Sequence, residues 1–285
     1  MKKGQKLTLK KNRFKGRILL WLGIALFLII TVIPFYWMFL TSFRPDVEIY
    51  SWPPKLFTSN FTLIHYIKLF TKSKFPIFLK NSILISAIVT LITVTISSMG
   101  AFSIVRLQFK NSAFLSKSIL FTYLIPQAIL FIPLLVVINK LNLFNTKWAL
   151  VVSYYTFSVP FCIWMLISYF KSVPPDMEEC AMIDGCTRFQ SFYKILLPMA
   201  APGIGAAALF TFTLAWNEFL YALVFTQSLT EKTVPVGISH LMLSDVYKWG
   251  MMMAASVISS IPIVVIYFIT QRFMITGITA GSTKG

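Results

Sequence analysis

Residues 178–198 read EECAMIDGCTRFQSFYKILLP, and this polar segment lies between two long apolar runs of the chain. Pro174 and Pro175 precede it, and proline suits the first position of a helix. Four acidic residues then fall within nine positions: Asp176, Glu178, Glu179 and Asp184. Acidic side chains are favoured in the first turn, where the helix dipole is positive. The sequence therefore predicts a short helix that begins at the prolines.

A second helix is predicted immediately after the first. Gly185 suits a left-handed cap at the end of the first helix. The stretch Thr187–Gln190 matches a capping box, which opens a helix. Four apolar residues follow at helical spacing and give this helix an apolar face: Phe189, Phe192, Tyr193 and Leu196. Pro198 is predicted to end it. Residues 174–198 thus form a helix–glycine–helix segment, called the elbow below. Its apolar face either packs against the chain's own helices or binds a groove of a partner protein.

The rest of the chain has the composition of a membrane protein. It is 57% hydrophobic and 12% charged, with a mean hydropathy of +0.76, whereas about a quarter of residues are charged in soluble domains. Six stretches are long enough to span the hydrocarbon core, which takes about 20 apolar residues as a helix: 18–40, 82–105, 118–139, 148–170, 201–226 and 250–271. Backbone groups in lipid must be paired internally, which a helix achieves. We therefore expect an all-α polytopic protein of the lipid bilayer with six transmembrane helices.

The distribution of positive charge predicts the topology. Net charge is +17, and eight of the 26 basic residues precede residue 18. Such clusters beside a first span mark the cytoplasmic side, so this excess is interpreted as a topology signal and not as a nucleic-acid site. The first apolar run is longer than the core of a signal peptide, and no small-residue cleavage site follows it. An even number of spans places both termini in the cytoplasm. The expected divisions are a basic arm (1–17), a first span with an extracytoplasmic segment (18–81), a transmembrane core (82–272) that contains the elbow, and a cytoplasmic tail (273–285).

The sequence offers no constellation for catalysis. Cys162, Cys180 and Cys186 lack metal-ligand spacing, and both histidines, His65 and His240, lie outside the predicted spans. An enzyme in the membrane would need a nucleophile with its base, or a metal site. The phosphate-binding pattern Gly-x4-Gly-Lys-Ser/Thr does not occur in the chain. We expect no bound cofactor or metal, so any ATP with Mg²⁺ must bind another chain.

Glu218 is the one acidic residue within a predicted span. Acidic side chains inside a membrane are costly and mark candidate functional sites. Two interpretations stay open: Glu218 pairs neighbouring helices, or it lines a solute path together with Trp216, Asn217 and Tyr221. The two aromatic residues would then form either a sugar platform or an interfacial belt.

The elbow resembles the EAA loop of ABC importer permeases. The resemblance is carried by Glu179-Cys180-Ala181, then Gly185 and, after nine intervening residues, Ile195-x-Leu197-Pro198. Cys180 and Cys186 stand where that family usually has alanine. WNEFLYALVFT at 216–226, TVPVGI at 233–238 and GITAGSTKG at 277–285 are similar to the carbohydrate branch, and to the maltose-type permease subunit with a C-terminal tail.

That resemblance implies the six-helix MetI-like permease fold and a cell-membrane subunit that couples to a separate ATPase. The partners it implies are a second, homologous permease in a heterodimer, two ATPase subunits and an extracytoplasmic solute-binding protein. The ATPase-coupling residues it implies are Glu178, Glu179, Ala181, Asp184, Gly185, Ile195, Leu197 and Pro198. The tail residues it places against the ATPase are Gly277, Thr279, Ala280 and Gly281. The residues it places against the binding protein are Thr233, Val234, Pro235, Val236 and Gly237.

The solute stays open at this point. A sugar or oligosaccharide is the main expectation, and a polyol or glycerol phosphate is the alternative within ABC importers. A channel or a secondary carrier is a different class of function. A proton-coupled carrier would show several ionisable groups at mid-membrane, and Glu218 alone meets that description.

Overall fold

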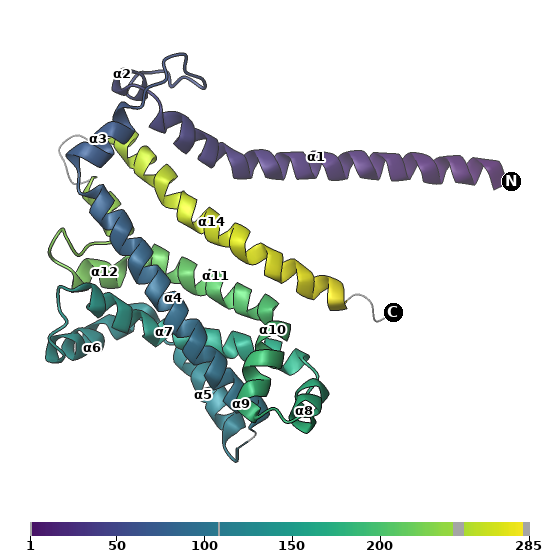
Figure 1. Cartoon of the computed structure of the whole chain (residues 1–285). Coiled ribbons are helices and arrows are strands. Elements are labelled where there is room, and N and C mark those ends of the chain that lie inside the picture. Colours follow the sequence, from purple (N-terminus) through teal and green to yellow (C-terminus); the bar gives the residue numbers. More distant parts are fainter. Residues whose placement is uncertain (1, 108, 242–247, 282–285) are drawn as a thin grey trace. The chain divides into compact units, whose positions relative to one another are not determined.

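A computed structural model describes residues 2–107, 109–241 and 248–281, with side chains described within 17–107, 109–241 and 248–273. All regular elements of these residues are helices (Figure 1). In chain order they are α1 (Lys2–Ser42), α2 (Asp46–Ile49), α3 (Ile64–Lys72), α4 (Phe75–Arg106), α5 (Ser112–Tyr123), α6 (Gln127–Lys140), α7 (Lys147–Ser172), α8 (Asp176–Ile183), α9 (Arg188–Ser191), the π-helical turn η1 (Phe192–Leu196), α10 (Leu197–Met199), α11 (Ala201–Asn217), α12 (Leu220–Phe225), α13 (Val234–His240) and α14 (Trp249–Gly281).

Four single helices of the described residues are long and apolar enough to cross a membrane: Leu19–Ser42 of α1, all of α4 and α7, and Trp249–Phe273 of α14. Two further spans are bent pairs, α5 with α6 and Arg188–Met199 with α11. The described chain thus has four to six spans, depending on whether each bent pair crosses once.

The third and fifth predicted spans are not continuous helices, which corrects the expectation of an unbroken 118–139 and 201–226. The third bends by 96° between α5 and α6, where Pro126 has no N–H to continue the helix. The fifth ends at Asn217, because Glu218 adopts an extended backbone with ψ of 127°. The short α12 then starts at Leu220.

The basic segment is helical where the structure describes it. The helical backbone of α1 starts at Lys2, so residues 2–17 are continuous with the first span. The apolar side chains of Leu19–Ser42 are exposed along most of the span, as expected for a helix that meets lipid or another subunit.

The chain forms two compact units. The first contains Met1–Thr71 and Tyr247–Ile258. In it, the Glu48 carboxylate accepts hydrogen bonds from Thr58 Oγ1 (2.7 Å) and Asn60 Nδ2 (2.9 Å). The Thr58 hydrogen bond lowers the pKa of Glu48, with Asn60, Lys55 and Arg44 acting the same way and desolvation opposing them. The charged Glu48 carboxylate thus holds together the segment that follows α1.

Within the same unit, α3 packs against the start of α14 through His65 and Gly250. The His65 Nε2 atom lies 2.6 Å from the carbonyl oxygen of Arg44. A Cβ atom added to Gly250 would lie 2.2 Å from the imidazole ring. The absence of a side chain at Gly250 therefore makes room for the buried histidine.

The second unit contains Lys72–Val246 and Ser259–Gly285. Its core lies where α4, α7 and α11 pack together. One apolar cluster joins Ile85 and Val89 of α4 to Tyr154 of α7 and to Val236 of α13. A second cluster joins Ala101 and Val105 of α4 to Phe170, Phe192 and Leu196. The two clusters lie in opposite halves of α4, and each contacts one candidate functional segment.

Candidate functional site

The elbow has the local structure that its sequence predicts. Helix α8 ends at Ile183, and Gly185 has a φ of +91°. The N–H of Cys186 donates to the carbonyl oxygen of Ala181 (2.9 Å), and that of Gly185 to the carbonyl of Met182 (3.1 Å). This pair of hydrogen bonds is the Schellman arrangement, which favours glycine at the left-handed position.

The capping box of the second elbow helix is confirmed. The N–H of Gln190 donates to Thr187 Oγ1 (3.2 Å), and the N–H of Thr187 donates to Gln190 Oε1 (2.8 Å). The helix does not end at Pro198 as predicted. It passes through the π-helical turn η1 and ends at Met199. Pro198 lies one residue before this end of the helix.

The apolar residues of the elbow divide into two groups. Phe192 and Leu196 are buried in the second apolar cluster, and the Phe192 ring lies 4.7 Å from that of Phe102 on α4. Ile183 and Phe189, in contrast, are 85% and 61% exposed. The two interpretations of the apolar face therefore apply to different residues: one group packs on the chain itself, and the other is exposed.

The two neighbouring glutamates of the elbow also have different environments. Glu178 is buried, and its Oε1 atom accepts a hydrogen bond from Arg106 Nε (2.6 Å). Arg106 Nη2 donates to the carbonyl oxygen of Val173 (2.8 Å). The Arg106 and Glu178 side chains are 15% and 7% exposed. Water therefore solvates neither charge well, and each is stabilised by the other. Glu179 is exposed.

The other coupling residues predicted from the sequence lie close by in the elbow. Asp184, Gly185 and Pro198 are exposed, Ile195 and Leu197 are half-buried, and Ala181 is buried. Their roles stay predictions, but the buried position of Glu178 separates it from the residues that a partner could touch directly.

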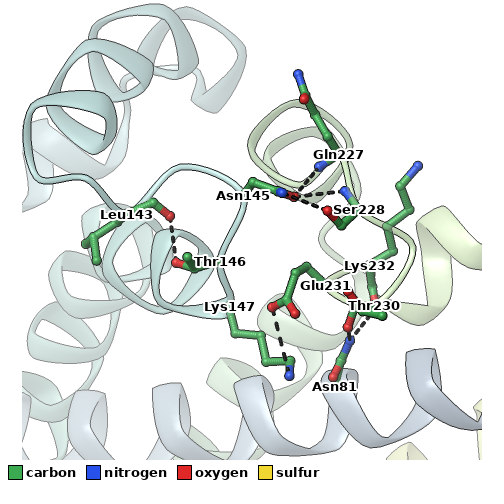
Figure 2. Close-up of polar contacts among 10 residues, drawn as sticks. All are labelled: Asn81, Leu143, Asn145, Thr146, Lys147, Gln227, Ser228, Thr230, Glu231 and Lys232. Carbon is green, nitrogen blue, oxygen red and sulfur yellow. Dashed lines mark hydrogen bonds and ion pairs between the residues drawn. The ribbon is translucent and has the colours of Figure 1, made fainter.

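At the opposite end of α4, the α12–α13 loop (226–233) is fixed by a network of polar contacts (Figure 2). Asn145, in the turn between α6 and α7, has a φ of +59°. Its Oδ1 atom accepts hydrogen bonds from the N–H groups of Gln227 (2.9 Å) and Ser228 (2.8 Å), and its Nδ2 donates to Ser228 Oγ (2.7 Å). Lys147 Nζ lies 3.9 Å from Glu231 Oε2. One side of the loop is therefore held by α7 and the turn before it.

Helix α4 holds the other side of the same loop. Asn81 Nδ2 donates to the carbonyl oxygens of Thr230 (2.8 Å) and Lys232 (3.0 Å), as Figure 2 shows. One residue further along α4, Ser82 Oγ accepts a hydrogen bond from the N–H of Val234 (2.8 Å). Buried backbone groups need such partners, so this loop has a defined conformation.

The sequence-predicted contact residues for a binding protein lie in the first turn of α13 and just before it. Thr233, Val234, Val236 and Gly237 are buried, and Pro235 is half-buried. The exposed part of this region is the loop tip at 227–230. These residues therefore support the loop, and its tip is the surface that faces outward from the unit.

Gly237 allows α13 to lie close to α4. A Cβ atom at this position would lie 2.1 Å from Phe78 Cδ2. We expect Gly237→Ala to lower the free energy of unfolding by about 1–3 kcal/mol, the usual cost of overpacking. Thermal denaturation of the purified protein checks this. Adding Phe78→Leu to the same protein should restore part of the loss, and an unchanged melting temperature for Gly237→Ala would contradict the packing.

Glu218 lies at the break between α11 and α12 and is 8% exposed. Its carboxylate accepts hydrogen bonds from the Tyr154 hydroxyl (2.8 Å) and from the N–H groups of Tyr221 (2.8 Å) and Ala222 (3.0 Å). The side chain thus joins α7 to the first turn of α12, where the unpaired N–H groups of a helix start favour an anion.

A cleft of about 390 Å³ opens beside this break. Its wall contains four polar residues and five apolar ones: Gln127, Thr213, Asn217 and Glu218, and Phe157, Phe210, Leu214, Phe219 and Leu220. Of the four predicted path residues, Asn217 and Glu218 line the cleft. Trp216 and Tyr221 do not line it and are buried. Trp216 and Tyr221 are therefore exposed neither in this cleft nor on the surface, and their roles stay predictions.

The tail prediction falls at the edge of the described residues. Helix α14 extends to Gly281, so Gly277, Thr279, Ala280 and Gly281 have a helical backbone, whereas 282–285 lie outside the described residues. Among the described residues, no group of three or more potential metal ligands occurs.

Sequence reasoning missed four residues that these contacts single out: Arg106, Tyr154, Asn81 and Asn145. Arg106 ends a long apolar run, and a lone arginine there carries a weak signal for an ion pair. Asn81 lies at the start of an apolar segment, where a buried amide needs partners, and Asn145 lies in a turn. None of these signals identifies the partner, because each partner lies more than 60 residues away in the chain.

Comparison with known proteins agrees with an all-helical, membrane-spanning protein. Residues 94–279, more than half of the chain, match the family described as Binding-protein-dependent transport system inner membrane component. The trehalose/maltose transport system permease protein MalG of Thermococcus litoralis is 40% identical over 272 residues, which cover 94% of this chain and 97% of that protein. The inner membrane ABC transporter permease protein YcjP of Escherichia coli K12 is 36% identical over 276 residues, covering 96% and 99%.

The fold is also found in solved structures of a bacterial ABC transporter that imports alginate. One chain matches with a TM-score of 0.78 at 18% identity, covering 92% of this chain and 97% of that one. A second structure, in complex with an alginate pentasaccharide-bound periplasmic protein, matches with a TM-score of 0.69 at 19% identity, covering 91% and 93%. With the family match and two relatives above 30% identity over nearly its whole length, this chain belongs to the binding-protein-dependent transport system inner membrane component family and is a membrane-spanning permease subunit of an ABC importer.

Proposed function

We propose that this permease imports a sugar or oligosaccharide and that its elbow binds the ATPase which drives import. Subunits of this family carry no ATPase domain, so ATP is hydrolysed by a partner chain. The solute class is supported by the relative named for trehalose and maltose transport. The alginate importer that shares the fold transports another carbohydrate.

The exposed apolar tip of the elbow is the observation that carries the docking proposal. Ile183 and Phe189 flank the tight turn at Gly185 and are exposed, while the acidic Glu179 and Asp184 surround them. Short apolar helices presented in this way bind hydrophobic grooves of partner proteins. Glu179 would pair with a basic side chain beside such a groove, whereas Glu178 stays bound to Arg106.

The remaining partners follow from the same proposal. The elbow and both termini face the cytoplasm, in agreement with the basic N-terminal arm. A second, homologous permease completes the translocation pathway, and two ATPase subunits bind the two elbows. The tip of the α12–α13 loop at 227–230 faces an extracytoplasmic solute-binding protein. The tail from Gly277 onward reaches the ATPase subunits.

The cleft beside Glu218 is the proposed part of the solute path in this subunit. Polar groups of Gln127, Asn217 and Glu218 lie next to the aromatic rings of Phe157 and Phe210. Sugars combine hydroxyl groups with apolar ring faces, and pockets that bind small molecules join apolar walls to a few placed polar groups.

The docking proposal is tested by replacing Gly185, whose φ of +91° proline cannot adopt. We expect Gly185→Pro to lower the amount of ATPase that co-purifies from native membranes by about tenfold or more, which corresponds to 1.4 kcal/mol of docking free energy. Mass spectrometry of the tagged permease identifies and quantifies the partner chains.

Gly185→Asn is the matched control, because asparagine tolerates the left-handed backbone, and it should retain the ATPase. Ile183→Glu should lose the ATPase without altering the turn. If the wild-type protein purifies without an ATPase, or if Gly185→Pro and Ile183→Glu retain it in full, the docking proposal fails. Uptake of labelled trehalose, maltose and glycerol 3-phosphate into proteoliposomes of the complex then separates sugars from other solutes.

A further inference from the structure

Helix α4 is fixed at its two ends to two different functional segments. At the elbow end, Arg106 binds the Glu178 carboxylate and the Val173 carbonyl, and Phe102 packs on Phe192. At the other end, Asn81 and Ser82 bind three backbone groups of the α12–α13 loop and α13. Within the described residues, Arg106–Glu178 is the ion pair that joins the elbow to a spanning helix.

The helix between these contacts is uninterrupted. It has 32 residues, which corresponds to about 48 Å at about 1.5 Å per residue. Its one proline, Pro76, lies in the first turn, whereas α7 and α14 contain Pro160 and Pro262 in their interiors. Sharp kinks in helices occur mostly at proline or at breaks in the hydrogen-bond ladder. A displacement of one end of α4 is therefore carried to the other end.

The elbow is also connected to α12 along the chain, through α11, but this route is less suited to transmitting a displacement. The elbow continues into α11, but a 78° bend separates the two. Helix α11 then stops at Asn217, and α12 follows after the break at Glu218. Movement passing along α11 would meet a bend at its start and a break at its end.

We propose that α4 couples the elbow to the α12–α13 loop, with Arg106 and Asn81 as the positioning residues at its two ends. The proposal rests on the proposed function, because it assumes that an ATPase binds the elbow. A conformational change driven there would shift the loop tip at 227–230 on the opposite side of the permease. Coupling between two binding sites is reciprocal, so a partner that binds the loop tip would in turn favour one state of the elbow.

Two cysteine reporters test the proposal in the purified permease–ATPase complex. The first is the native Cys180, which is exposed on α8, in a protein with Cys162→Ala and Cys186→Ala. The second is Leu229→Cys at the exposed loop tip, with all three native cysteines replaced by alanine. The measurement is the rate of modification by a water-soluble maleimide with and without MgATP. We expect MgATP to change both rates in the wild-type background.

Substitutions that remove the contacts of α4 with the elbow or with the α12–α13 loop should separate the response of the loop reporter from that of Cys180. In Asn81→Ala and Asn81→Asp, which both lose the amide donor, we expect the MgATP effect at Cys180 to remain. The effect at Leu229→Cys should fall by about fivefold or more, the lower range of typical coupling factors. Arg106→Met should have the same effect on the loop reporter, and Arg106→Lys should keep part of the response because it retains the charge.

Matched controls distinguish a loss of coupling through α4 from a general loss of packing around the loop or the elbow. Lys147→Gln removes a contact to the same loop that comes from α7 and not from α4. Lys171→Gln removes an exposed charge near the elbow end of α7. Both should leave the response of the loop reporter unchanged.

The outcomes are distinct. Loss of the loop response in the α4 variants but not in the controls supports the proposal. If the loop reporter keeps its full MgATP response in Asn81→Ala and Arg106→Met, α4 is not the coupling element. A wild-type protein in which Cys180 responds and Leu229→Cys does not would overturn it as well. If neither reporter responds in the wild-type complex, the docking of the ATPase on the elbow fails, and the coupling proposal fails with it.

Discussion

Gly203→Ala is expected to disrupt the packing of α11 on α7. A Cβ atom at Gly203 would lie 2.2 Å from Tyr169 Cγ and 2.6 Å from Tyr169 Cβ. Both atoms lie close to the α7 backbone, so a change of side-chain rotamer cannot move them away together. The two helices must separate, and overpacking of this kind typically costs about 1–3 kcal/mol and occasionally more. We expect a lower melting temperature and loss of monodisperse protein on size-exclusion chromatography.

Gly205→Ala is the matched control for this effect. It lies two residues further along α11, and an added Cβ atom would make ordinary contacts of 3.4–3.9 Å with Phe273 and Thr270. We expect Gly205→Ala to leave the melting temperature nearly unchanged. Tyr169→Ala combined with Gly203→Ala should regain only part of the stability lost in Gly203→Ala, because it removes the clashing ring but keeps the Tyr169 Cβ atom at 2.6 Å. If Gly203→Ala and Gly205→Ala melt at the same temperature, the close approach of α7 and α11 is contradicted.

Glu218→Ala is expected to have the second large effect. It removes the acceptor of the Tyr154 hydroxyl and of the Tyr221 and Ala222 N–H groups. Each buried donor left without a partner costs about 1–3 kcal/mol. We expect α12 to lose its fixed position against α7, and the purified protein to melt at a lower temperature than the wild type.

Glu218→Gln and Tyr154→Phe separate the structural role of Glu218 from a role in transport. Tyr154→Phe removes one hydrogen bond but keeps the carboxylate in the cleft wall. Glu218→Gln keeps an acceptor for the backbone but removes the charge. We expect Glu218→Gln to lower solute uptake while the complex still assembles, and Tyr154→Phe to retain uptake. Normal uptake by Glu218→Gln would restrict Glu218 to joining the helices.

The elbow shows how far local sequence rules extend. The glycine cap and the capping box were predicted correctly because each involves residues within a few positions of one another. The π-helical turn and the continuation through Pro198 were missed, because they depend on how Phe192 and Leu196 pack in the second apolar cluster. Glu178 and Glu179 could not be told apart either. Adjacent helical residues point about 100° apart, and the position of Arg106 decides which of the two is buried.

The breaks in the spans show a similar limit. Pro126 and Glu218 both stand inside expected spans, and Glu218 is expected either to pair neighbouring helices or to line a solute path. A proline allows a bend but does not fix its angle, and the 96° turn between α5 and α6 also depends on the helices around it. The extended backbone at Glu218 is stabilised by Tyr154, 64 residues earlier in the chain.

The sequence by itself determined that the chain crosses a membrane, that its spans are helical and that residues 174–198 form a capped elbow. These features follow from average hydrophobicity and from interactions between near neighbours. The tertiary structure alone decided that Arg106 holds Glu178, that Asn81 and Asn145 hold the α12–α13 loop, and that α4 lies between the two segments. Such pairings form between residues far apart in the chain, and they become defined only when the packing of α4, α7 and α11 brings their side chains within hydrogen-bonding distance.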